Sequence, residues 1–585
     1  MKKIFFIISI LLIISNYSFA QTLNPKSIVE LKLKIIRSGY LSTNNVEKMN
    51  LSIYIPQENI ESIDIFTDGG TWKYIYDKFG NKIVLLEWRK PKGIIKYSVE
   101  TIVKNSAKHL SYEKQIGSDS DYLKETETIV FTDELKKVAY PYEKTLKKVS
   151  ELTNWVNKYM TYDISYTGKN LPSDKVFLER HGVCVEYSNL LTTLLRINGI
   201  PTRYVVGYAY SSVQNKFIGH AWVEVLANDG SWIPFDPTWL QGGYLDATHI
   251  KTANLLDNSQ VDTLSYVGDS VDWQKNDEEF DILDYKTKNI ISIEMGASER
   301  IASNENGYLK VYINSNECAI SELTASSCVD LNKNKMFIIY DANRILWNCN
   351  SQELYWFFTP TNKNKYYYVC PVIVYDQIGT SKDIDIEIIP KKKINDIDIS
   401  GPNIVRTNEQ FRLIANTLDE FIFYSPDFGE HKNKIWDISI NKPGTYKFYL
   451  YSNGALSIKN ITVLEKKEFD IKIDAPNNIT LKNSFFSNII VKNLLDKEKI
   501  VDIKLEFDNY TLNDIISLKP SEEKIITYNL TANYIGNRKI QFSIFSDTLI
   551  TYSSSIYVYE IKKKSWIDDI FDLFSNVIKW FSWLF

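Results

Sequence analysis

Residues 181–239 read HGVCVEYSNLLTTLLRINGIPTRYVVGYAYSSVQNKFIGHAWVEVLANDGSWIPFDPTW. After a Gly-containing turn, Cys184 opens an apolar pattern with helical spacing. The side chains expected on its buried face are Leu190, Leu191, Leu194, Leu195 and Ile197. Gly199 and Pro201 end the pattern, as expected for a helix stop. Cys184 therefore falls in the first turn of a helix, where free backbone N–H groups and the helix dipole favour a thiolate.

A β-hairpin is predicted further along the same stretch. Residues 220–226 and 231–236 alternate as two strands, and Asn228-Asp229-Gly230 is a turn signal between them. A four-residue loop between the strands places His220 one residue from the position opposite Asp236. A loop one residue shorter places the two residues directly opposite each other. Opposed residues point to the same face of a sheet. The sequence therefore predicts a carboxylate beside an imidazole.

A thiol at a helix start, an imidazole and an orienting carboxylate form the activated-nucleophile arrangement. The motifs GxCxEYxxLLxxLLRxxGIPxR, GHAWVEV and FDPTW follow in this order over roughly residues 140–250. They resemble the core of the transglutaminase-like superfamily, a branch of the papain-like cysteine enzymes. The resemblance implies that Cys184 is the nucleophile, that His220 is the general base and acid, and that Asp236 fixes the imidazole tautomer.

The resemblance implies a cysteine enzyme acting on amide bonds of protein or peptide through a thioester. The backbone N–H of Cys184, at the helix start, is a natural oxyanion donor. The superfamily includes transglutaminases, proteases and peptide N-glycanases, and the lack of paired CxxC motifs argues against the last. We expect hydrolysis rather than transamidation. The alternative is a non-catalytic surface or adhesion protein that uses the core as a scaffold.

Other candidate residues near the motifs have simpler interpretations. His181 lies three residues before Cys184 and is an alternative base, but no carboxylate partner is in view. His249, three residues after Asp246, is interpreted as structural. Trp155 lies at helical spacing within residues 141–160, which read as a helix, and is interpreted as core. No HExxH or CxxC pair occurs, so no metal site and no cofactor is expected.

Chain length predicts a multidomain protein, and the resemblance to the superfamily implies an α+β fold with a papain-like core. At 585 residues the chain exceeds a single core, and a net charge of −4 gives no case for a nucleic-acid partner. A papain-like core, a preceding antiparallel β domain and about three Ig-like β-sandwich modules are expected. The expected ranges are a signal peptide at 1–20, a β domain at 21–130, the catalytic core at 131–285, β modules at 286–395, 396–466 and 467–560, and a C-terminal helix at 565–585.

Export and cysteine usage point the same way. Lys2 and Lys3, the apolar run Ile4–Ile14 and Ser18-Phe19-Ala20 are typical of a cleaved secretory signal. An exported chain with an odd cysteine count leaves one thiol unpaired. We expect two disulfides, both within 286–395, and a free Cys184, with three pairings open for the remaining cysteines, which are Cys318, Cys328, Cys349 and Cys370.

The C-terminal segment 565–585 reads as an amphipathic helix. Its apolar face is expected to carry Ile567, Phe571, Phe574, Ile578, Phe581 and Phe585. Asp568, Asp572 and Lys579 make spanning a membrane costly, so we expect the helix to lie in the membrane interface. The predicted location is extracellular, at the cell surface or on a membrane, with a protein or peptide as substrate.

Overall fold

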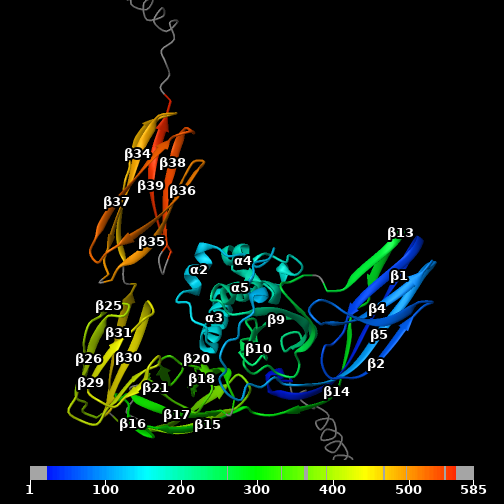
Figure 1. Ribbon diagram of the computed structural model, residues 1–585. Helices are drawn as coiled ribbons and strands as arrows, with labels where there is room; N and C mark the ends of the chain where they lie inside the picture. The colour runs from blue at the N-terminus through cyan, green and yellow to red at the C-terminus, as the bar shows by residue number, and fades with distance from the viewer. Residues whose placement is uncertain are drawn as a thin grey trace, which may run out of the picture. The chain divides into compact units, whose positions relative to one another are not determined.

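The computed structural model describes residues 23–560, except 260, 316, 331, 362–366, 391, 466, 467, 496 and 546–548 (Figure 1). The expected signal peptide at 1–20 and the expected helix at 565–585 lie outside the described residues. Within the described part of the chain, no helix combines the length and the apolar character needed to cross a membrane. Strands dominate, and the α-helices of the described residues all fall between residues 133 and 197.

The chain divides into two compact units. The first extends through Val405 and includes Glu409–Val463, and the second comprises Arg406–Asn408 and the chain from Leu464. The first unit holds an N-terminal sheet, the helical region with its own sheet, and two β modules. The second unit holds a third β module.

The N-terminal sheet is built on one long strand, β1 (Ile28–Tyr54). Its path runs β2-β5-β1-β4-β3, with β13 and β14 also antiparallel to β1. The remaining strands are β2 (Ile60–Thr67), β3 (Thr71–Tyr76), β4 (Lys82–Arg89), β5 (Gly93–Ser106), β13 (Thr263–Lys275) and β14 (Glu279–Thr287). In Figure 1 the green β13 runs beside the blue β1. Residues 263–287, which the sequence analysis counted largely with the core at 131–285, therefore complete this sheet.

The helical region packs on a five-stranded antiparallel sheet with the order β11-β10-β9-β8-β12. The helices are α2 (Asp133–Ala139), α3 (Leu146–Tyr159), α4 (Ser173–Glu179) and α5 (Cys184–Ile197). The strands are β8 (Thr202–Ser211), β9 (Lys216–Leu226), β10 (Trp232–Asp236), β11 (Gln241–Gly242) and β12 (Ile250–Leu255). Short elements are β6 (Thr161–Tyr162), β7 (His181–Gly182), η1 (Pro25–Ser27), η2 (Ser120–Leu123) and η3 (Ile164–Tyr166).

Local sequence explains where the helices begin and end. The helix expected at 141–160 begins later, at Leu146, because the Thr145 side chain caps it by accepting from the Lys148 N–H. α5 buries Leu190, Leu191, Leu194 and Leu195 completely, as its spacing predicts. It ends at Ile197, and Gly199, which follows the C-cap Asn198, has a φ of +71° that suits glycine. Ile197, expected on the buried face, is only partly buried.

The three β modules each consist of two sheets. The first module contains β15 (Ile291–Ala297), β16 (Arg300–Ala302), β17 (Gly307–Ser315), β18 (Ala319–Ser327), β19 (Phe337–Ile339), β20 (Asn343–Asn348), β21 (Gln352–Pro360), β22 (Tyr368–Asp376) and β23 (Ser381–Ile389). The second contains β24 (Asp398–Ser400), β25 (Ile404–Arg406), β26 (Gln410–Asn416), β27 (Ile422–Ser425), β28 (Gly429–His431), β29 (Ile435–Ser439), β30 (Gly444–Ser452) and β31 (Ala455–Leu464).

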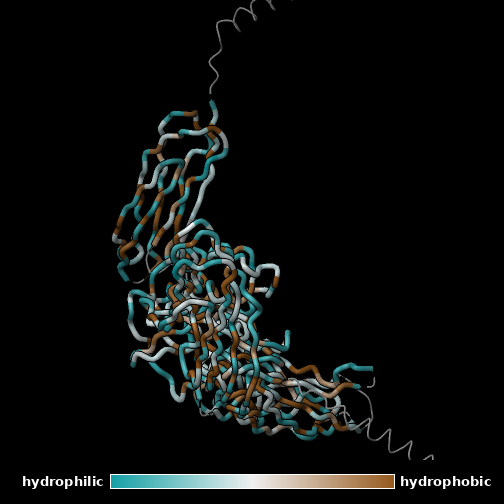
Figure 2. Tube along the Cα trace, turned by 90° about the vertical axis from the view of Figure 1, so that its right-hand side faces the viewer, coloured by the Kyte–Doolittle hydropathy of each residue, from teal (hydrophilic) through white to brown (hydrophobic). Residues whose placement is uncertain are grey.

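The third module contains β32 (Phe469–Asp474), β33 (Asn478–Thr480), β34 (Ser484–Asn493), β35 (Lys499–Phe507), β36 (Tyr510–Leu518), β37 (Glu523–Thr531), β38 (Gly536–Phe545) and β39 (Leu549–Tyr559). Brown and teal residues alternate along its strands (Figure 2), and β35 shows the period-2 burial expected of a strand with one face in a core. Its two sheets share one hydrophobic cluster.

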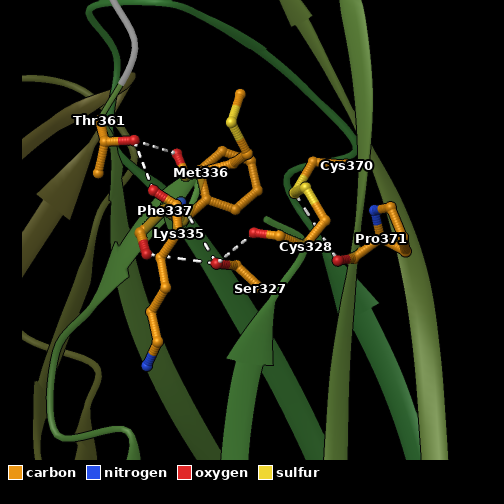
Figure 3. The surroundings of a disulfide bond; sticks show 8 residues. All are labelled: Ser327, Cys328, Lys335, Met336, Phe337, Thr361, Cys370 and Pro371. Carbon is orange, nitrogen blue, oxygen red and sulfur yellow. Dashed lines mark hydrogen bonds between the residues drawn. A yellow bond between two sulfur atoms is a disulfide. The ribbon is translucent and has the colours of Figure 1, made fainter. Parts of the chain in front are cut away.

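Two disulfides join neighbouring parts of the first module. They pair Cys318 with Cys349 and Cys328 with Cys370, which selects one of the three pairings that the sequence left open. The second bond lies beside Ser327, whose hydroxyl bonds the carbonyl of Phe337 (Figure 3). All five cysteines are in the described part of the chain, and Cys184 alone among them is unpaired.

The first β module packs directly against the helical region (Figure 1). Cys318 and Ile320 belong to the same hydrophobic cluster as the leucines of α5, and the Trp347 ring stacks on Phe235 with centroids 5.9 Å apart. Gly243 allows this approach, because a Cβ there would lie 2.2 Å from the Cys318 carbonyl oxygen. The module is therefore part of one folded body with the helical region, rather than a detached spacer.

Candidate active site

Cys184 is the first residue of α5 and is partly exposed. The chain reaches it through β7, which pairs in parallel with β6 so that Gly182 lies beside Tyr162. Gly182 is required, because a Cβ there would lie 2.3 Å from the Cβ of Glu186. The buried Glu186 carboxylate in turn accepts from the Val183 N–H at 2.9 Å. The Gly-x-Cys-x-Glu spacing is therefore a device that holds the cysteine at the helix start.

His220 and Asp236 come from the adjacent strands β9 and β10. Trp232 pairs with Leu226 and Phe235 with Val223, so the same register places Asp236 across from Trp222. The predicted register was therefore wrong, because the loop has five residues and is closed by a hydrogen bond from the Ala227 N–H to the Ser231 carbonyl. Asp236 therefore lies two positions from the residue directly opposite His220. Because side chains alternate between the two faces of a sheet, this even offset keeps His220 and Asp236 on the same face.

The three side chains predicted for the site meet. The Nε2 atom of His220 lies 3.0 Å from Oδ2 of Asp236, and Cys184 is close enough to the imidazole to help raise its pKa. Because Nε2 is engaged by Asp236, Nδ1 is the ring nitrogen left for sulfur. Both His220 and Asp236 are buried, whereas Cys184 is partly open to solvent.

Charge rather than burial sets the protonation of this group. Burial lowers the pKa of His220, but Asp236 and Cys184 outweigh it and raise the pKa to about 10. Burial raises the pKa of Asp236, but His220 and His249 outweigh it and hold the pKa well below its ordinary value. An imidazolium beside a carboxylate is thus the favoured state at neutral pH.

Aromatic rings fix the His220 imidazole. The Trp239 ring stacks on it with centroids 4.1 Å apart and an interplanar angle of 9°, and Trp222 lies at 6.1 Å. Trp239 is the last residue of the FDPTW motif. The backbone N–H of Trp239 also donates to Oδ1 of Asp236 at 3.3 Å. The motif therefore supplies both the carboxylate and a wall for the imidazole.

His249, which the sequence analysis interpreted as structural, lies beside the predicted site residues. It precedes β12 and lies fully buried, with Nε2 3.4 Å from Oδ2 of Asp236. Nothing in the local sequence links it to Asp236, because the turn through β11 brings the two together. The one available signal was Asp246, three residues earlier, whose carboxylate lies 3.3 Å from Nδ1 of His249.

His181 and Trp155, the other candidates from the sequence, make their contacts with residues other than Cys184, His220 and Asp236. His181 donates from Nδ1 to the Glu179 carbonyl at 2.8 Å and stacks on Tyr166. Trp155 stacks on Tyr159 with centroids 4.3 Å apart and packs against the helical core. Tyr162, which the sequence analysis did not single out, is half-exposed; burial and the nearby Cys184 raise the pKa of its phenol.

A family model described as the transglutaminase-like superfamily matches residues 134–237. This chain carries a transglutaminase-like domain. The match runs from α2 through β10 and so includes Cys184, His220 and Asp236. The recognition of the superfamily from the three sequence motifs is confirmed.

Relatives of the transglutaminase-like domain match only part of the chain. A protein-glutamine gamma-glutamyltransferase of Pseudomonas aeruginosa is 33% identical over 81 residues, 12% of each chain. An uncharacterized protein of Mycobacterium leprae is 31% identical over 109 residues, 18% of this chain and 38% of that protein. The matches thus span well under half the length of these curated relatives.

Two solved structures are similar to this chain only at low TM-scores. A candidate cysteine protease from Cytophaga hutchinsonii has a TM-score of 0.35 and 20% identity, covering 44% of this chain and 93% of that one. Red sea bream transglutaminase has a TM-score of 0.18 and 10% identity, covering 88% and 92%. Scores of this size support no statement about the arrangement of the whole chain.

Within the described residues of the transglutaminase-like domain, His220, Asp236 and His249 come close enough to reach one cation. Their potential ligand atoms lie within 4.8 Å of one another. Both histidines, however, already face Asp236 at hydrogen-bonding distances of 3.0 and 3.4 Å. We therefore interpret the cluster as a hydrogen-bonded network.

Proposed function

We propose that this chain is an exported cysteine enzyme that cleaves amide bonds of proteins or peptides through a thioester on Cys184. The observation that carries the proposal is a buried imidazole held by a carboxylate, with a helix-start thiol close enough to act on its pKa. The match of residues 134–237 to the transglutaminase-like superfamily supports a cysteine enzyme.

The first half-reaction forms the thioester. The Cys184 thiolate attacks the carbonyl carbon, a C–S bond forms, and the π electrons move onto oxygen. The N–H groups at the start of α5 have no acceptor within the helix and can donate to this oxyanion. The oxyanion then collapses, the C–N bond breaks, and the His220 imidazolium gives its proton to the leaving amine.

The second half-reaction releases the acyl group. His220, now neutral, takes a proton from water while the water oxygen attacks the thioester carbonyl. The C–S bond breaks, leaving a carboxylic acid, the Cys184 thiolate and the His220 imidazolium. Asp236 holds the imidazole so that the same ring nitrogen serves both halves. We propose water as the main acceptor, since Cys184 is partly open to solvent.

Transamidation is the second candidate, and the match with the Pseudomonas aeruginosa glutamyltransferase favours it. In that case a primary amine attacks the thioester instead of water. The two outcomes differ in product, because hydrolysis yields a new carboxylate and transamidation a new amide.

The experiment compares both acceptors in one reaction. Purified protein is incubated with a mixed peptide library and a fluorescent primary amine, and products are identified by mass spectrometry. Hydrolysis predicts cleaved or deamidated peptides with little dye incorporated, and transamidation predicts dye on glutamine. A Cys184→Ala variant is the matched control. If neither product exceeds this control, the enzyme proposal fails and the non-catalytic adhesion protein is favoured.

Export and membrane contact complete the proposal. Two disulfides in the first module fit an oxidising compartment. The segment 565–585, with its apolar face, is proposed to lie on a membrane surface. Flotation with liposomes tests this: the full chain should float at low and high salt, and a chain ending at Glu560 should not. Equal flotation of the two chains would contradict the proposal that segment 565–585 binds the membrane.

A further inference from the structure

His249 lies between two carboxylates in the interior of the transglutaminase-like domain. Its Nε2 atom is 3.4 Å from Oδ2 of Asp236, and its Nδ1 atom is 3.3 Å from Oδ1 of Asp246. The side chains of all three are at most 1% exposed. One buried imidazole therefore lies between two anionic oxygens, with Nε2 at hydrogen-bonding distance from Asp236 and Nδ1 at ion-pair distance from Asp246 but without a hydrogen bond.

Neither carboxylate is free to turn away. Oδ1 of Asp236 accepts from the N–H groups of Thr238 and Trp239, at 2.8 and 3.3 Å. Asp246 accepts from the Gln241 amide at 2.7 Å, and from the Thr248 N–H and hydroxyl at 2.9 and 2.5 Å. Each carboxylate is thus surrounded by donors that keep it ionised and fixed in orientation.

This arrangement determines the protonation of His249. A neutral imidazole carries one N–H and one lone pair, so it would direct a lone pair at one of the two carboxylates. An imidazolium donates to Asp236 through Nε2 and places its positive charge 3.3 Å from Oδ1 of Asp246. Consistently, burial lowers the pKa of His249, but Asp246 and Asp236 outweigh it and raise the pKa. Burial raises the pKa of Asp246, but His249 outweighs it and lowers the pKa.

The charged side chains of the cavity beside His249 form ion pairs with one another. This cavity, of about 20 Å³ on the β9 and β12 side of His249, is also lined by Glu58, Lys108, Glu224 and Lys251. These form ion pairs between Lys108 and Glu58 and from Lys251 to both glutamates. Lys26 is close enough to act on Asp236 and Asp246, and His220 shares Oδ2 of Asp236 with His249.

We infer that His249 is a positioning residue of the proposed cysteine enzyme, held as an imidazolium between Asp236 and Asp246 so that it fixes the Asp236 carboxylate and offsets part of its charge. The inference rests on the proposed function and extends the Cys184–His220–Asp236 group by a second imidazole–carboxylate pair. The positive charge of His249 affects His220, because an Asp236 carboxylate whose charge is partly offset holds the His220 proton less tightly. His220 can then release that proton to the leaving amine.

The test is the pH profile of kcat/KM on an amide substrate for the His249→Gln variant. The glutamine amide can still donate to Asp236 but carries no charge. The two imidazole centroids are 5.5 Å apart, so losing this charge should move both limbs of the profile upward by about one to two pH units at an effective dielectric constant of about 20 to 40. His431→Gln, in β28 of the second β module, is the matched control and should leave both limbs in place.

A second readout does not depend on activity. The chain has five histidines, so ¹⁵N-histidine labelling resolves the imidazole nitrogens of the full-length protein. His249 should show two protonated nitrogens at pH 7, and Asp246→Asn should lower the pH at which one proton is lost. This measurement tests the protonation state of His249 even if the wild-type protein cleaves no amide. It also tests the inference if the His249→Gln variant does not fold.

Two results would overturn the inference. One is a neutral His249 tautomer at pH 7 in the wild-type protein. The other is a folded His249→Gln variant whose pH profile matches that of the wild type. Loss of all amide cleavage in the wild type, with His249 doubly protonated, would instead contradict the proposed function alone.

Discussion

Asp236 is the residue on which the geometry of the site depends. Both of its oxygens accept hydrogen bonds, from two backbone N–H groups on Oδ1 and from two imidazoles on Oδ2. The backbone donors belong to Thr238 and Trp239, so the Asp-Pro-Thr-Trp sequence folds back on its own carboxylate. His220 receives its orientation from this carboxylate and from the Trp239 ring.

Asp236→Asn should preserve the fold and reduce turnover. The asparagine amide presents an N–H toward His220 and favours the wrong tautomer, a change that costs about 10⁴-fold in the serine-protease triad. Steady-state kinetics on a peptide amide, with the melting temperature as a check on folding, measure the effect. His181→Ala, beside the nucleophile in sequence but bonded to the Glu179 carbonyl, is the comparison and should be tolerated. Full activity of Asp236→Asn would show that the carboxylate assignment is wrong.

His220 should make the folded state less stable at high pH. Its pKa rises from 6.5 to about 10 on folding, so the folded state holds the proton more tightly. The stabilisation is complete below pH 6.5 and is lost as pH rises toward 10, with a slope of at most about 1.4 kcal/mol per pH unit. Denaturant unfolding of wild type and His220→Gln between pH 6 and 10 measures it. An identical pH dependence in the two proteins would contradict the raised pKa.

At the scale of elements, helix α5 and the β9–β10 hairpin were accessible from sequence because both are local. Leucine spacing and Gly199 define the helix, and alternation with an Asn-Asp-Gly turn defines the hairpin. The register was wrong because loop length depends on the hydrogen bond between Ala227 and Ser231. Relative to the directly opposed pairing, the error was an even number of positions, so His220 and Asp236 still lie on the same face of the sheet.

Long-range pairings were beyond the sequence argument. The pairing of β13 and β14 with β1 joins residues more than two hundred positions apart, for instance Leu51 with Leu264, and local alternation says nothing of such partners. The place of His249 depends on the same kind of long-range pairing, because β12, which follows His249, pairs with β8. Disulfide pairing likewise required the strand order of the first module.

Packing of the first β module on β10 should affect both stability and activity. Trp347→Ala removes the ring that stacks on Phe235, next to Asp236. We expect a loss of about 2–4 kcal/mol in the free energy of unfolding, somewhat below the value for a fully buried aromatic, together with reduced turnover. Tyr375→Ala, whose ring is 40% exposed in β22, is the matched control. Equal stability of the two variants would argue against the shared core.

At the scale of the whole molecule, the first unit is continuous. One hydrophobic cluster joins Leu31 of β1, Phe217 of β9 and Leu309 of the first module. The first and second modules share a second cluster around Phe357 and Tyr449. The third module, by contrast, has a hydrophobic core of its own.

Truncation should follow this division. A chain ending at Glu465 keeps the hydrogen bond from the Thr407 N–H to the Leu464 carbonyl, and should retain amide turnover and the melting temperature of the first unit. A chain ending at Thr287 loses the Cys318, Ile320 and Trp347 contacts and should not fold. Calorimetry and turnover of both chains check this. A folded and active chain ending at Thr287 would contradict the conclusion that the helical region and the first β module form one folded body.

The central claim, that Cys184 is an activated nucleophile acting through a thioester, is tested most directly by trapping the acyl-enzyme. The protein is mixed with a reactive peptide ester, quenched in acid within seconds, and mapped by mass spectrometry without reduction. The account predicts one acyl group per chain, on Cys184, diminished in His220→Ala. It also predicts one equivalent of iodoacetamide at the same residue, since the other four cysteines are paired. Acylation elsewhere, or none at Cys184 in a folded protein, would contradict it.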